Sequence, residues 1–425
     1  MTSKQSSSPH ARGACPTLAK PMAVADGLLV RFRPVAEGFT PDQLEALASS
    51  ARDYGNGLIE VTARGNVQVR GLTAETEQNF RMALDAAGIE AQTGVSIEIS
   101  PIAGLDPKAV RDPRPLARAI RQVCDATLEK GPLSPKLSIV IVSGGQLLLD
   151  GLKADIRLIA RHDCWILEVG GETIGALAEA QAAEAVGLIL AMLQDEGPSS
   201  RGMDLQLGRI RAQLPFVDAR PLTLTRPASY VLGPISLTDG GVALRIGLPF
   251  GQVKSAQLFA LARSMRQYGV VDARPAPDRT LALTGFDSSA MQALSPALAA
   301  HGFWTRQDVG ASRLTLCSGA EKSEIGIIQA AELAMALFAV APDLIDGSFH
   351  IHVSTCAKGC PHAGRPGIML CGNALTHYRG ATQKPFASLD PGAMEASIVD
   401  LAARIRETRR PEDSTLESLD RLGHE

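Results

Sequence analysis

Three cysteines in the last third of the chain have the residue type and spacing of metal ligands. Cys356 and Cys360 lie within "HVSTCAKGCPHAGRPG", and Cys317 lies earlier, in "SRLTLCSG". Thiolates are soft ligands that favour zinc or iron–sulfur clusters. A cubane iron–sulfur cluster normally takes four cysteines, one more than this set provides. The residues therefore predict a thiolate metal centre with one ligand still to be found.

Histidines beside the two closely spaced cysteines offer a second ligand set. His352, Cys356, Cys360 and His362 could form the two-histidine, two-cysteine arrangement of a tetrahedral zinc site. The spacing fits zinc and iron–sulfur alike, so both metals remain open from the residues alone.

The composition restricts the class of protein that surrounds this centre. The chain has 425 residues, 45% of them apolar and 20% charged, with a formal net charge of −3. These values indicate a soluble globular protein. The slight acidity and an aromatic content of 4% argue against a nucleic-acid-binding surface.

Cysteine usage and the lack of apolar targeting segments suggest the compartment. The opening residues contain no apolar signal segment, and "VGLILAML" (186–193) is too short to span a membrane. We therefore expect a cytoplasmic protein without membrane contacts, whose cysteines serve metal or redox chemistry rather than disulfides. Cys124 and Cys164 are expected to be buried apolar residues.

An internal repeat organises the elements that must position the metal centre. Shifting the sequence by 214 positions places 251–269 on 37–55 and brings identical residues together. The coincident pairs are Gln43/Gln257, Leu44/Leu258, Ala46/Ala260, Leu47/Leu261, Ala48/Ala262, Arg52/Arg266, Tyr54/Tyr268, Gly55/Gly269 and Gly71/Gly285. The matching Tyr-Gly ends and the same order of strands on both sides favour duplication over two unrelated amphipathic helices.

Each copy is expected to run strand, helix, strand, strand, helix, which is a ferredoxin-like split βαβ unit. In the first copy a strand at 26–34 precedes a helix that Thr40 can cap, with Gln43 completing a capping box. Two strands over 58–72 and a second helix ending at Gly88 follow. Two such units in one chain could pair about a pseudo-two-fold axis.

Two α/β segments alternate with the ferredoxin-like units, and the second segment carries the cysteines. The expected organisation is a flexible tail (1–20), ferredoxin-like unit 1 (21–98), α/β domain 1 (99–225), ferredoxin-like unit 2 (226–305) and an α/β iron–sulfur domain (306–425). The expected fold class is therefore α+β.

With the duplicated unit, "CSGAEKS" and "HVSTCAKGC", the sequence resembles the sirohaem sulfite/nitrite reductase superfamily. Within that superfamily several phrases are most similar to the precorrin-3B synthases. They are "GACPTLAKPM", "DGLLVRF", "GLDPKAVRDPRPLARAI", "SPKLSIVIVSGG", "GLPFGQVKSAQLFALA" and "HVSTCAKGCPH". The likeness spans about residues 13–380.

The resemblance implies a [4Fe-4S] cluster held by the motifs C-x5-C and C-x3-C. Cys317, Cys356 and Cys360 match three of its ligands, whereas Ser323 stands at the fourth position. A serine oxygen is harder than a thiolate, so the ligand set is incomplete or is finished by another group. Cys371 is the nearest spare thiol.

The resemblance also implies basic residues that bind tetrapyrrole carboxylates. Arg64 in "TARGNVQ" matches such an arginine, and Arg70, six residues on, is expected on the same face. Arg114 in "DPRP" and Lys136 in "SPK" fall where further carboxylate-binding groups occur. The reductases usually carry a lysine two residues after the position of Lys136, where this chain has Ser138.

The resemblance to the precorrin-3B synthases implies an oxygen-dependent monooxygenase of aerobic cobalamin biosynthesis. Precorrin-3A would be hydroxylated at C20 with closure of a γ-lactone, using dioxygen and electrons that originate from NADH and arrive through an electron-transfer protein. A mononuclear non-haem iron is associated with this chemistry, but His350, His352 and His362 form no clear triad with a carboxylate.

Two other functions remain open at the level of sequence. One is a sirohaem-dependent sulfite or nitrite reductase, which Ser138 disfavours. The other is a non-catalytic zinc or tetrapyrrole-binding relative that lost its cluster together with the cysteine expected at Ser323.

Overall fold

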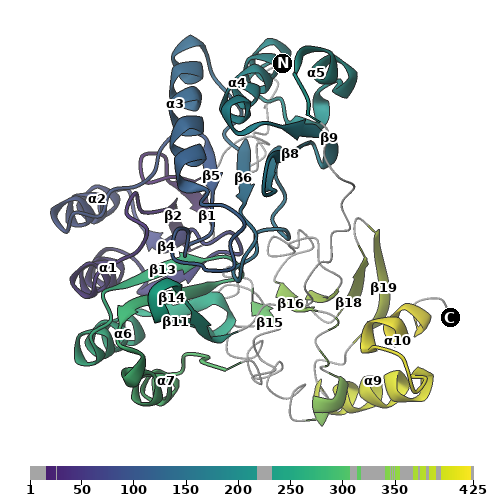
Figure 1. Cartoon of the computed structure of the whole chain (residues 1–425). Coiled ribbons are helices and arrows are strands. Elements are labelled where there is room, and N and C mark those ends of the chain that lie inside the picture. The colour runs from purple at the N-terminus through teal and green to yellow at the C-terminus, as the bar shows by residue number, and fades with distance from the viewer. Residues whose placement is uncertain are drawn as a thin grey trace, which may run out of the picture.

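Helices surround four separate sheets in the part of the chain that the structure describes (Figure 1). The structure is a computed structural model. It describes residues 16–24, 26–217, 232–306, 314–316, 340–344, 346, 348, 350–354, 367–371, 374–379, 382–388 and 394–422. This arrangement confirms the expected α+β class.

The first ferredoxin-like unit has the predicted order of strand, helix, strand, strand and helix, and one further short strand precedes it. It comprises β1 (Met22–Val24), β2 (Gly27–Phe32), α1 (Pro41–Tyr54), β3 (Leu58–Val61), β4 (Val67–Leu72) and α2 (Glu77–Ala86). The Thr40 hydroxyl accepts the N–H of Gln43, and the Gln43 amide oxygen accepts the N–H of Thr40, so α1 begins with the expected capping box. The chain leaves α2 through Gly88, whose φ of 66° suits a residue without a Cβ.

The second unit repeats the first with the offset of 214 residues. It comprises β10 (Gly233–Ser236), β11 (Val242–Gly247), β12 (Gln252–Lys254), α6 (Ser255–Tyr268), β13 (Asp272–Ala276), β14 (Thr280–Phe286) and α7 (Met291–Ala300). Shifted by 214, α1 coincides with α6 and α2 with α7 at both ends. The ladder irregularity between Leu28 and Val30 recurs between Val242 and Leu244. Duplication is therefore confirmed at the level of strand register.

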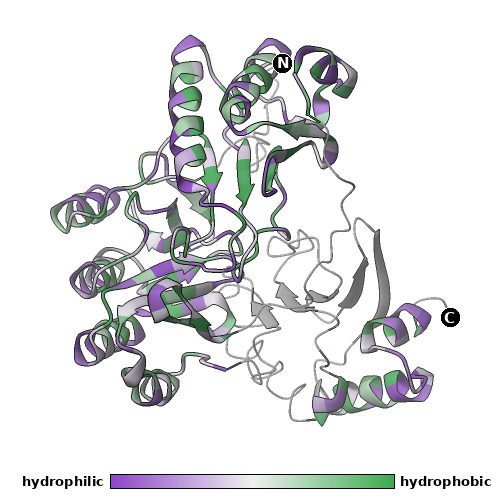
Figure 2. Cartoon of the chain, in the orientation of Figure 1, coloured by the Kyte–Doolittle hydropathy of each residue, from purple (hydrophilic) through white to green (hydrophobic). Residues whose placement is uncertain are grey.

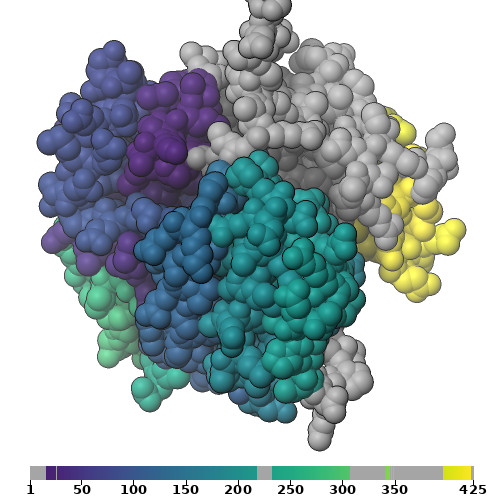
Figure 3. Space-filling view, turned by 90° about the horizontal axis from the view of Figure 1, so that it is seen from above, coloured from purple at the N-terminus to yellow at the C-terminus, as the bar shows by residue number. Residues whose placement is uncertain are grey.

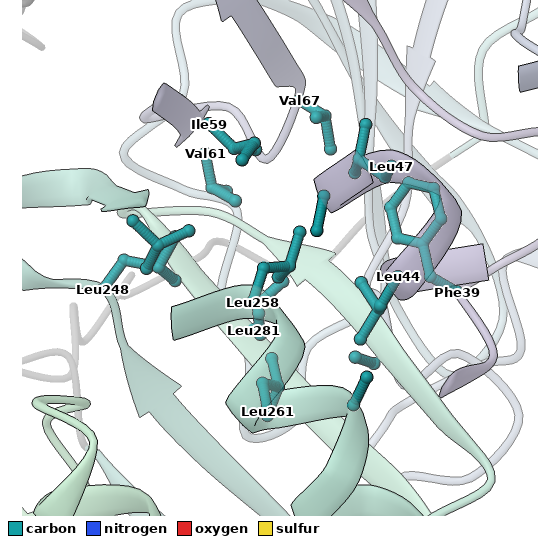
Figure 4. Packing of buried hydrophobic residues seen from close by; sticks show 14 of the residues in the cluster. Phe39, Leu44, Leu47, Ile59, Val61, Val67, Leu248, Leu258, Leu261 and Leu281 are labelled. Atoms are coloured by element: carbon teal, nitrogen blue, oxygen red, sulfur yellow. The ribbon is translucent and has the colours of Figure 1, made fainter. Parts of the chain in front are cut away.

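The two units exchange short strands across a pseudo-two-fold axis. β12, which precedes α6, pairs with β3 of the first unit through Val253 and Ile59. Phe39, which precedes α1, makes the equivalent bridge to Ala273 of β13. The helices α1 and α6 pack against each other, and one hydrophobic core contains residues of both units (Figure 4). Neither unit can bury its apolar face without the other.

The sheet between the two units is mixed. It comprises β5 (Ser96–Glu98), β6 (Ser138–Val142), β7 (Ile156–Ala160), β8 (Trp165–Val169) and β9 (Glu172–Leu177), in that order. The first three strands are parallel and the last two antiparallel. The helices α3 (Arg114–Lys130) and α4 (Glu179–Glu196) pack together, and α5 (Leu207–Gln213) follows. Because β5 pairs with β6, the boundary expected after residue 98 falls instead before β5.

The C-terminal sheet repeats this topology. Its strands are β15 (Leu314–Leu316), β16 (His350–Ser354), β17 (Gly367–Cys371), β18 (Ala374–Arg379) and β19 (Thr382–Ser388). Again three parallel strands are followed by two antiparallel ones. The helices α9 (Met394–Thr408) and α10 (Thr415–Leu422) follow. The segment "SEIGIIQAAELAMALFAV" (323–340), whose apolar pattern predicts a helix, lies almost wholly outside the described residues.

The hydropathy of the helices is consistent with one side of each facing a core. The described helices show polar residues on one side and apolar residues on the other (Figure 2). Seen from above, the α/β segment in blue and teal lies beside the purple first unit, with α9 and α10 in yellow at the far side (Figure 3). Among the described residues, no helix combines the length and apolarity needed to cross a bilayer.

Candidate functional site

Arg64 lies in the tight turn between β3 and β4, pressed against the second unit. Gly65 follows it with a φ of 76°, and a Cβ at this position would lie 2.9 Å from the carbonyl carbon of Ala276. Only glycine tolerates both conditions. The Asp278 N–H donates to the Ala63 carbonyl oxygen at 2.9 Å and fixes the turn in place.

The Arg64 side chain reaches out of its own unit to the neighbouring mixed sheet. Its Nε donates to Glu98 Oε1 at 2.8 Å and its Nη2 to Oε2 at 2.7 Å. Its Nη1 donates to the Lys153 carbonyl oxygen at 2.7 Å. The Glu98 side chain is 1% exposed and that of Arg64 is 30% exposed. These bonds use three of the five guanidinium N–H groups, so the partly exposed side can still meet a ligand.

The charges around Arg64 are arranged to keep it protonated. Burial opposes its charge, but the carboxylate of Glu98, with help from Asp155, holds the pKa of Arg64 above its ordinary value. Arg33 lies directly behind it and donates to the Arg64 carbonyl oxygen and to Asn66 Oδ1. Burial, together with the Arg64 charge, lowers the pKa of Arg33.

Asp155, just before β7, binds Ser138 and also acts on Arg64 through its charge. Its carboxylate accepts the Ser138 N–H at 3.0 Å and the Gly202 N–H at 2.9 Å. Arg201 binds it with two parallel bonds of 2.8 and 2.9 Å. Ser138 is therefore buried against a carboxylate that is already neutralised. A lysine side chain at this position would face the same carboxylate.

Arg114 begins α3 and pairs with a residue of its own loop. Its Nε lies 3.0 Å from both carboxylate oxygens of Asp112, and its Nη2 lies 2.8 Å from Oδ2. These hydrogen bonds raise the pKa of Arg114 and lower that of Asp112. The guanidinium lies over Gly104, where a Cβ would stand 1.9 Å from Nη2. Lys136 is exposed in the turn before β6, two residues from Ser138.

Arg70 is separated from Arg64 and has an internal partner. It lies near the end of β4 and is 7% exposed, with its Nη2 2.8 Å from Asp26 Oδ1 and its Nε 3.0 Å from Oδ2. The expectation that Arg64 and Arg70 share a strand face is wrong, because Arg64 lies in the turn rather than in a strand. The two arginines extend from opposite ends of β4.

A buried polar network on the first sheet was missed by sequence reasoning. Arg31 donates to Gln68 Oε1 at 2.8 Å, Gln68 donates to Glu60, and Gln252 of β12 donates to Glu60 Oε1 at 3.0 Å. Strand alternation puts these residues on the face opposite the α1 and α2 core. Polar residues within otherwise apolar strands, such as Gln68 and Arg70 of β4, were the available signal.

The strand ends nearest the predicted metal ligands are in register. In the parallel pair β15 and β16, Leu316 is opposite Val353, and in the pair β16 and β17, Ser354 is opposite Cys371. Cys317 is the next residue after β15, and Cys356 comes two residues after β16. The three strands therefore end at one edge of the sheet.

The predicted cluster ligands themselves are not among the described residues. Cys317, Ser323, Cys356 and Cys360 lie outside them, as does His362. Within the described part, no group of three or more histidine, cysteine, aspartate or glutamate side chains could hold a metal ion.

Two other cysteines are buried, as predicted. Cys124 is 0% exposed and Cys164 is 3% exposed. Burial raises the pKa of Cys124 to about 11 and also raises that of Cys164. Both are protonated at neutral pH and behave as small apolar residues.

Known proteins resemble this chain over most of its length. Residues 20–87 match the nitrite/sulfite reductase ferredoxin-like half domain. A precorrin-3B synthase from Sinorhizobium sp is 33% identical, with 97% of this chain and 93% of that protein covered. The chain belongs to the precorrin-3B synthase family. This membership confirms the family and the enzyme class predicted from sequence.

A more distant relative agrees with the sulfite/nitrite reductase superfamily, and a solved structure agrees with the fold. A ferredoxin–nitrite reductase from Synechococcus elongatus is 25% identical, with 80% of this chain and 76% of that protein covered. The structure of Mycobacterium tuberculosis NirA protein matches with a TM-score of 0.70 at 17% identity, covering 93% of this chain and 83% of that one. The second likeness shows the fold alone.

Proposed function

We propose that this chain acts as a precorrin-3B synthase in the cytoplasm. The observation that carries the proposal is the similarity to a precorrin-3B synthase along 97% of the chain. The polar environment of Ser138 supports it, because a buried serine bound to Asp155 stands where the resemblance to the reductases implies a lysine.

The substrate in this proposal is precorrin-3A, a tetrapyrrole with many carboxylates. Arg64, Arg114 and Lys136 would bind carboxylates of its rim, since guanidinium and ammonium groups complement them. Arg64 has unused N–H groups beside its bonds to Glu98 and Lys153. For Arg70 to bind substrate, its guanidinium would have to leave Asp26.

The reaction consumes dioxygen and two electrons. One oxygen atom enters the macrocycle as the C20 hydroxyl, and an acetate side chain closes onto the ring as a γ-lactone. The other oxygen atom leaves as water, which requires the electron pair of one NADH, delivered through an electron-transfer protein. The part of this chemistry assigned to the chain is to hold the macrocycle by its carboxylates.

An iron–sulfur cluster suits the carboxyl edge of the C-terminal sheet. Cys317, Cys356 and Cys360 would supply thiolates, and such a cluster supplies one-electron transfer when bound. The fourth ligand would be Ser323 or another group, and Cys371 is the described residue in register with the end of β16. The histidines at 350, 352 and 362 remain candidates for a mononuclear iron.

Anaerobic purification followed by metal analysis and turnover tests the proposal. We expect iron with acid-labile sulfide, no sirohaem, and conversion of precorrin-3A to a hydroxylactone with dioxygen and a reduced donor. Zinc alone would favour a binding protein without redox chemistry.

A sirohaem-dependent reductase is the second candidate, favoured by the similarity to a ferredoxin–nitrite reductase. Bound sirohaem and reduction of nitrite or sulfite by the purified protein would establish it. The same preparation therefore decides between the two activities.

A further inference from the structure

Arg161 lies at the carboxyl end of β7, on the side of the mixed sheet that α3 and α4 do not cover. Leu158 and Ala160 point into the core beneath those helices. Ile159 belongs to the smaller core on the opposite side, and Arg161 continues the same alternation. The Arg161 N–H donates to the Cys164 carbonyl oxygen at 2.9 Å, so its backbone is fixed by the turn between β7 and β8.

The guanidinium of Arg161 is buried along one edge without an acceptor. Its Nε and Nη2 are both buried and have no hydrogen-bond partner, while Nη1 approaches the Ala160 carbonyl oxygen at 3.3 Å. An arginine stays charged at any physiological pH, and a buried charged donor without an acceptor is strongly disfavoured. A missing anion or water is the ordinary explanation of such a group.

The backbone at Arg161 is also held by Arg111, whose own charge is compensated by Glu179. Arg111 Nε donates to the Arg161 carbonyl oxygen at 2.7 Å, and its Nη2 donates to the His162 carbonyl oxygen at 2.7 Å. Glu179 pairs with Arg111 and also accepts the Trp165 Nε1–H at 2.8 Å. The Glu179 carboxylate is therefore committed elsewhere. Asp163, the next nearest acid along the turn, interacts with Cys164.

The unpaired edge of Arg161 is the edge with which other arginines of this protein hold carboxylates. Nε and Nη2 together bind the acid in Arg64–Glu98, Arg70–Asp26, Arg114–Asp112, Arg201–Asp155 and Arg274–Asp272. Arg157, on the same face and four residues earlier, is already bound to Glu168 and to the Asp150 carbonyl oxygen. Arg161 thus offers a two-pronged donor of the shape that a carboxylate fits.

We propose that Arg161 binds a peripheral carboxylate of the tetrapyrrole substrate through Nε and Nη2. This inference rests on the proposed function. The extended step from Asp155 to Arg161 spans about 20 Å, and Arg64 contacts Lys153 just before it. Arg161 therefore holds a different carboxylate from the one at Arg64, and a ring with carboxylates around its rim can engage both.

Binding of uroporphyrin III, a stable octacarboxylate tetrapyrrole, tests the site by fluorescence quenching on the full chain. Arg161→Met should raise the Kd about tenfold or more, because a charge-assisted pair of hydrogen bonds is lost. Arg161→Lys should recover part of the affinity. Arg209→Met, which removes an exposed arginine of α5, is the matched control and should bind like the wild type.

Thermal unfolding without ligand distinguishes a binding role from a structural one. Since two donors of Arg161 lack partners in the free protein, Arg161→Met should leave the Tm unchanged or raise it. A lower Tm, or wild-type affinity in Arg161→Met, overturns the inference while the proposed function stands. Absence of uroporphyrin binding by the wild type overturns both.

Discussion

Arginine–carboxylate pairs set the geometry of the candidate site at the residue scale. Each pair fixes a side chain that sequence alone leaves free to rotate. The pair Arg64–Glu98 joins the first unit to the mixed sheet, so it orients the turn as well as the guanidinium. Because the carboxylate already fixes the guanidinium, little further side-chain entropy is lost when a ligand binds to it.

Removing the Arg64 side chain should lower the free energy of unfolding, because Glu98 then stays buried without its partner. Arg64→Ala leaves Glu98 buried without its partner, and we expect the free energy of unfolding to fall by about 2 kcal/mol, less than for a fully buried pair because Arg64 is partly exposed. Urea denaturation measures this. Arg64→Met combined with Glu98→Leu should recover most of the loss. Equal destabilisation by the double variant would contradict the pairing argument.

The Cys124 thiol should make the protein sensitive to alkali. Its pKa is about 11 in the folded protein and 9.0 when unperturbed, so the unfolded state loses the proton first. Stability is then complete below pH 9.0 and is lost by about 2 to 3 kcal/mol as the pH rises toward 11. Cys124→Val should flatten this part of the profile in urea titrations. Identical profiles for both proteins would refute the assignment.

Capping differs between the repeated helices at the element scale. Thr40 caps α1 with its hydroxyl, whereas Lys254, at the equivalent position of α6, has no acceptor in its side chain. The backbone and the glutamine at the third helical position are the same in both. The helix boundary is therefore set by more than the cap residue.

Substituting the two cap positions should separate these contributions. Thr40→Ala should lower the free energy of unfolding by about 1 kcal/mol, because a donor of the first turn loses its acceptor. Lys254→Ala is the matched control and should change stability by less than about 0.5 kcal/mol. Equal effects in thermal unfolding would mean that the Thr40 hydroxyl does not contribute.

The whole molecule depends on one core shared by the two ferredoxin-like units. Leu47 of α1 and Leu261 of α6 are both fully buried in it. A cavity made in one unit should therefore destabilise the other. The C-terminal sheet has its own strands, and two helices of its own follow it.

Trp304, at the end of the second unit, can report on this coupling. In a Trp165→Phe background, Leu47→Ala should shift the Trp304 fluorescence transition in urea, with a loss of about 2 to 5 kcal/mol. Leu261→Ala should shift the same transition by a similar amount. If Leu47→Ala left the Trp304 transition unmoved, the units would be unfolding independently.

The cluster can be tested at the scale of the whole protein by its metal content. Cys360→Ser should lose iron and sulfide, because a thiolate ligand is removed, while the far-UV CD spectrum stays that of the wild type. Ser323→Cys should restore a complete thiolate set and alter the EPR spectrum of the reduced protein. Wild-type iron content in Cys360→Ser would remove this residue from the ligand set.

The repeat, its elements and the family could be read from the sequence because they depend on local patterns. Apolar patterns and glycines define α1, α6 and their strands, and the Thr40 cap adds to the signal for α1. The 214-residue offset of identities such as Tyr54/Tyr268 also holds for the strand register. The family motifs are contiguous as well. These features are encoded by residues close together in the sequence, and local apolar periodicity is enough to predict the helices and strands.

The partners of the charged side chains were decided by tertiary structure alone. Strand β5 pairs with β6 of the mixed sheet. Arg70 binds Asp26, and Arg64 of the first unit binds Glu98 of the mixed sheet. The unpaired edge of Arg161 is likewise a property of packing. A charged side chain pairs with whichever group the fold brings within hydrogen-bonding distance. Arg64 and Glu98 are 34 positions apart, so no local sequence pattern indicates that they pair.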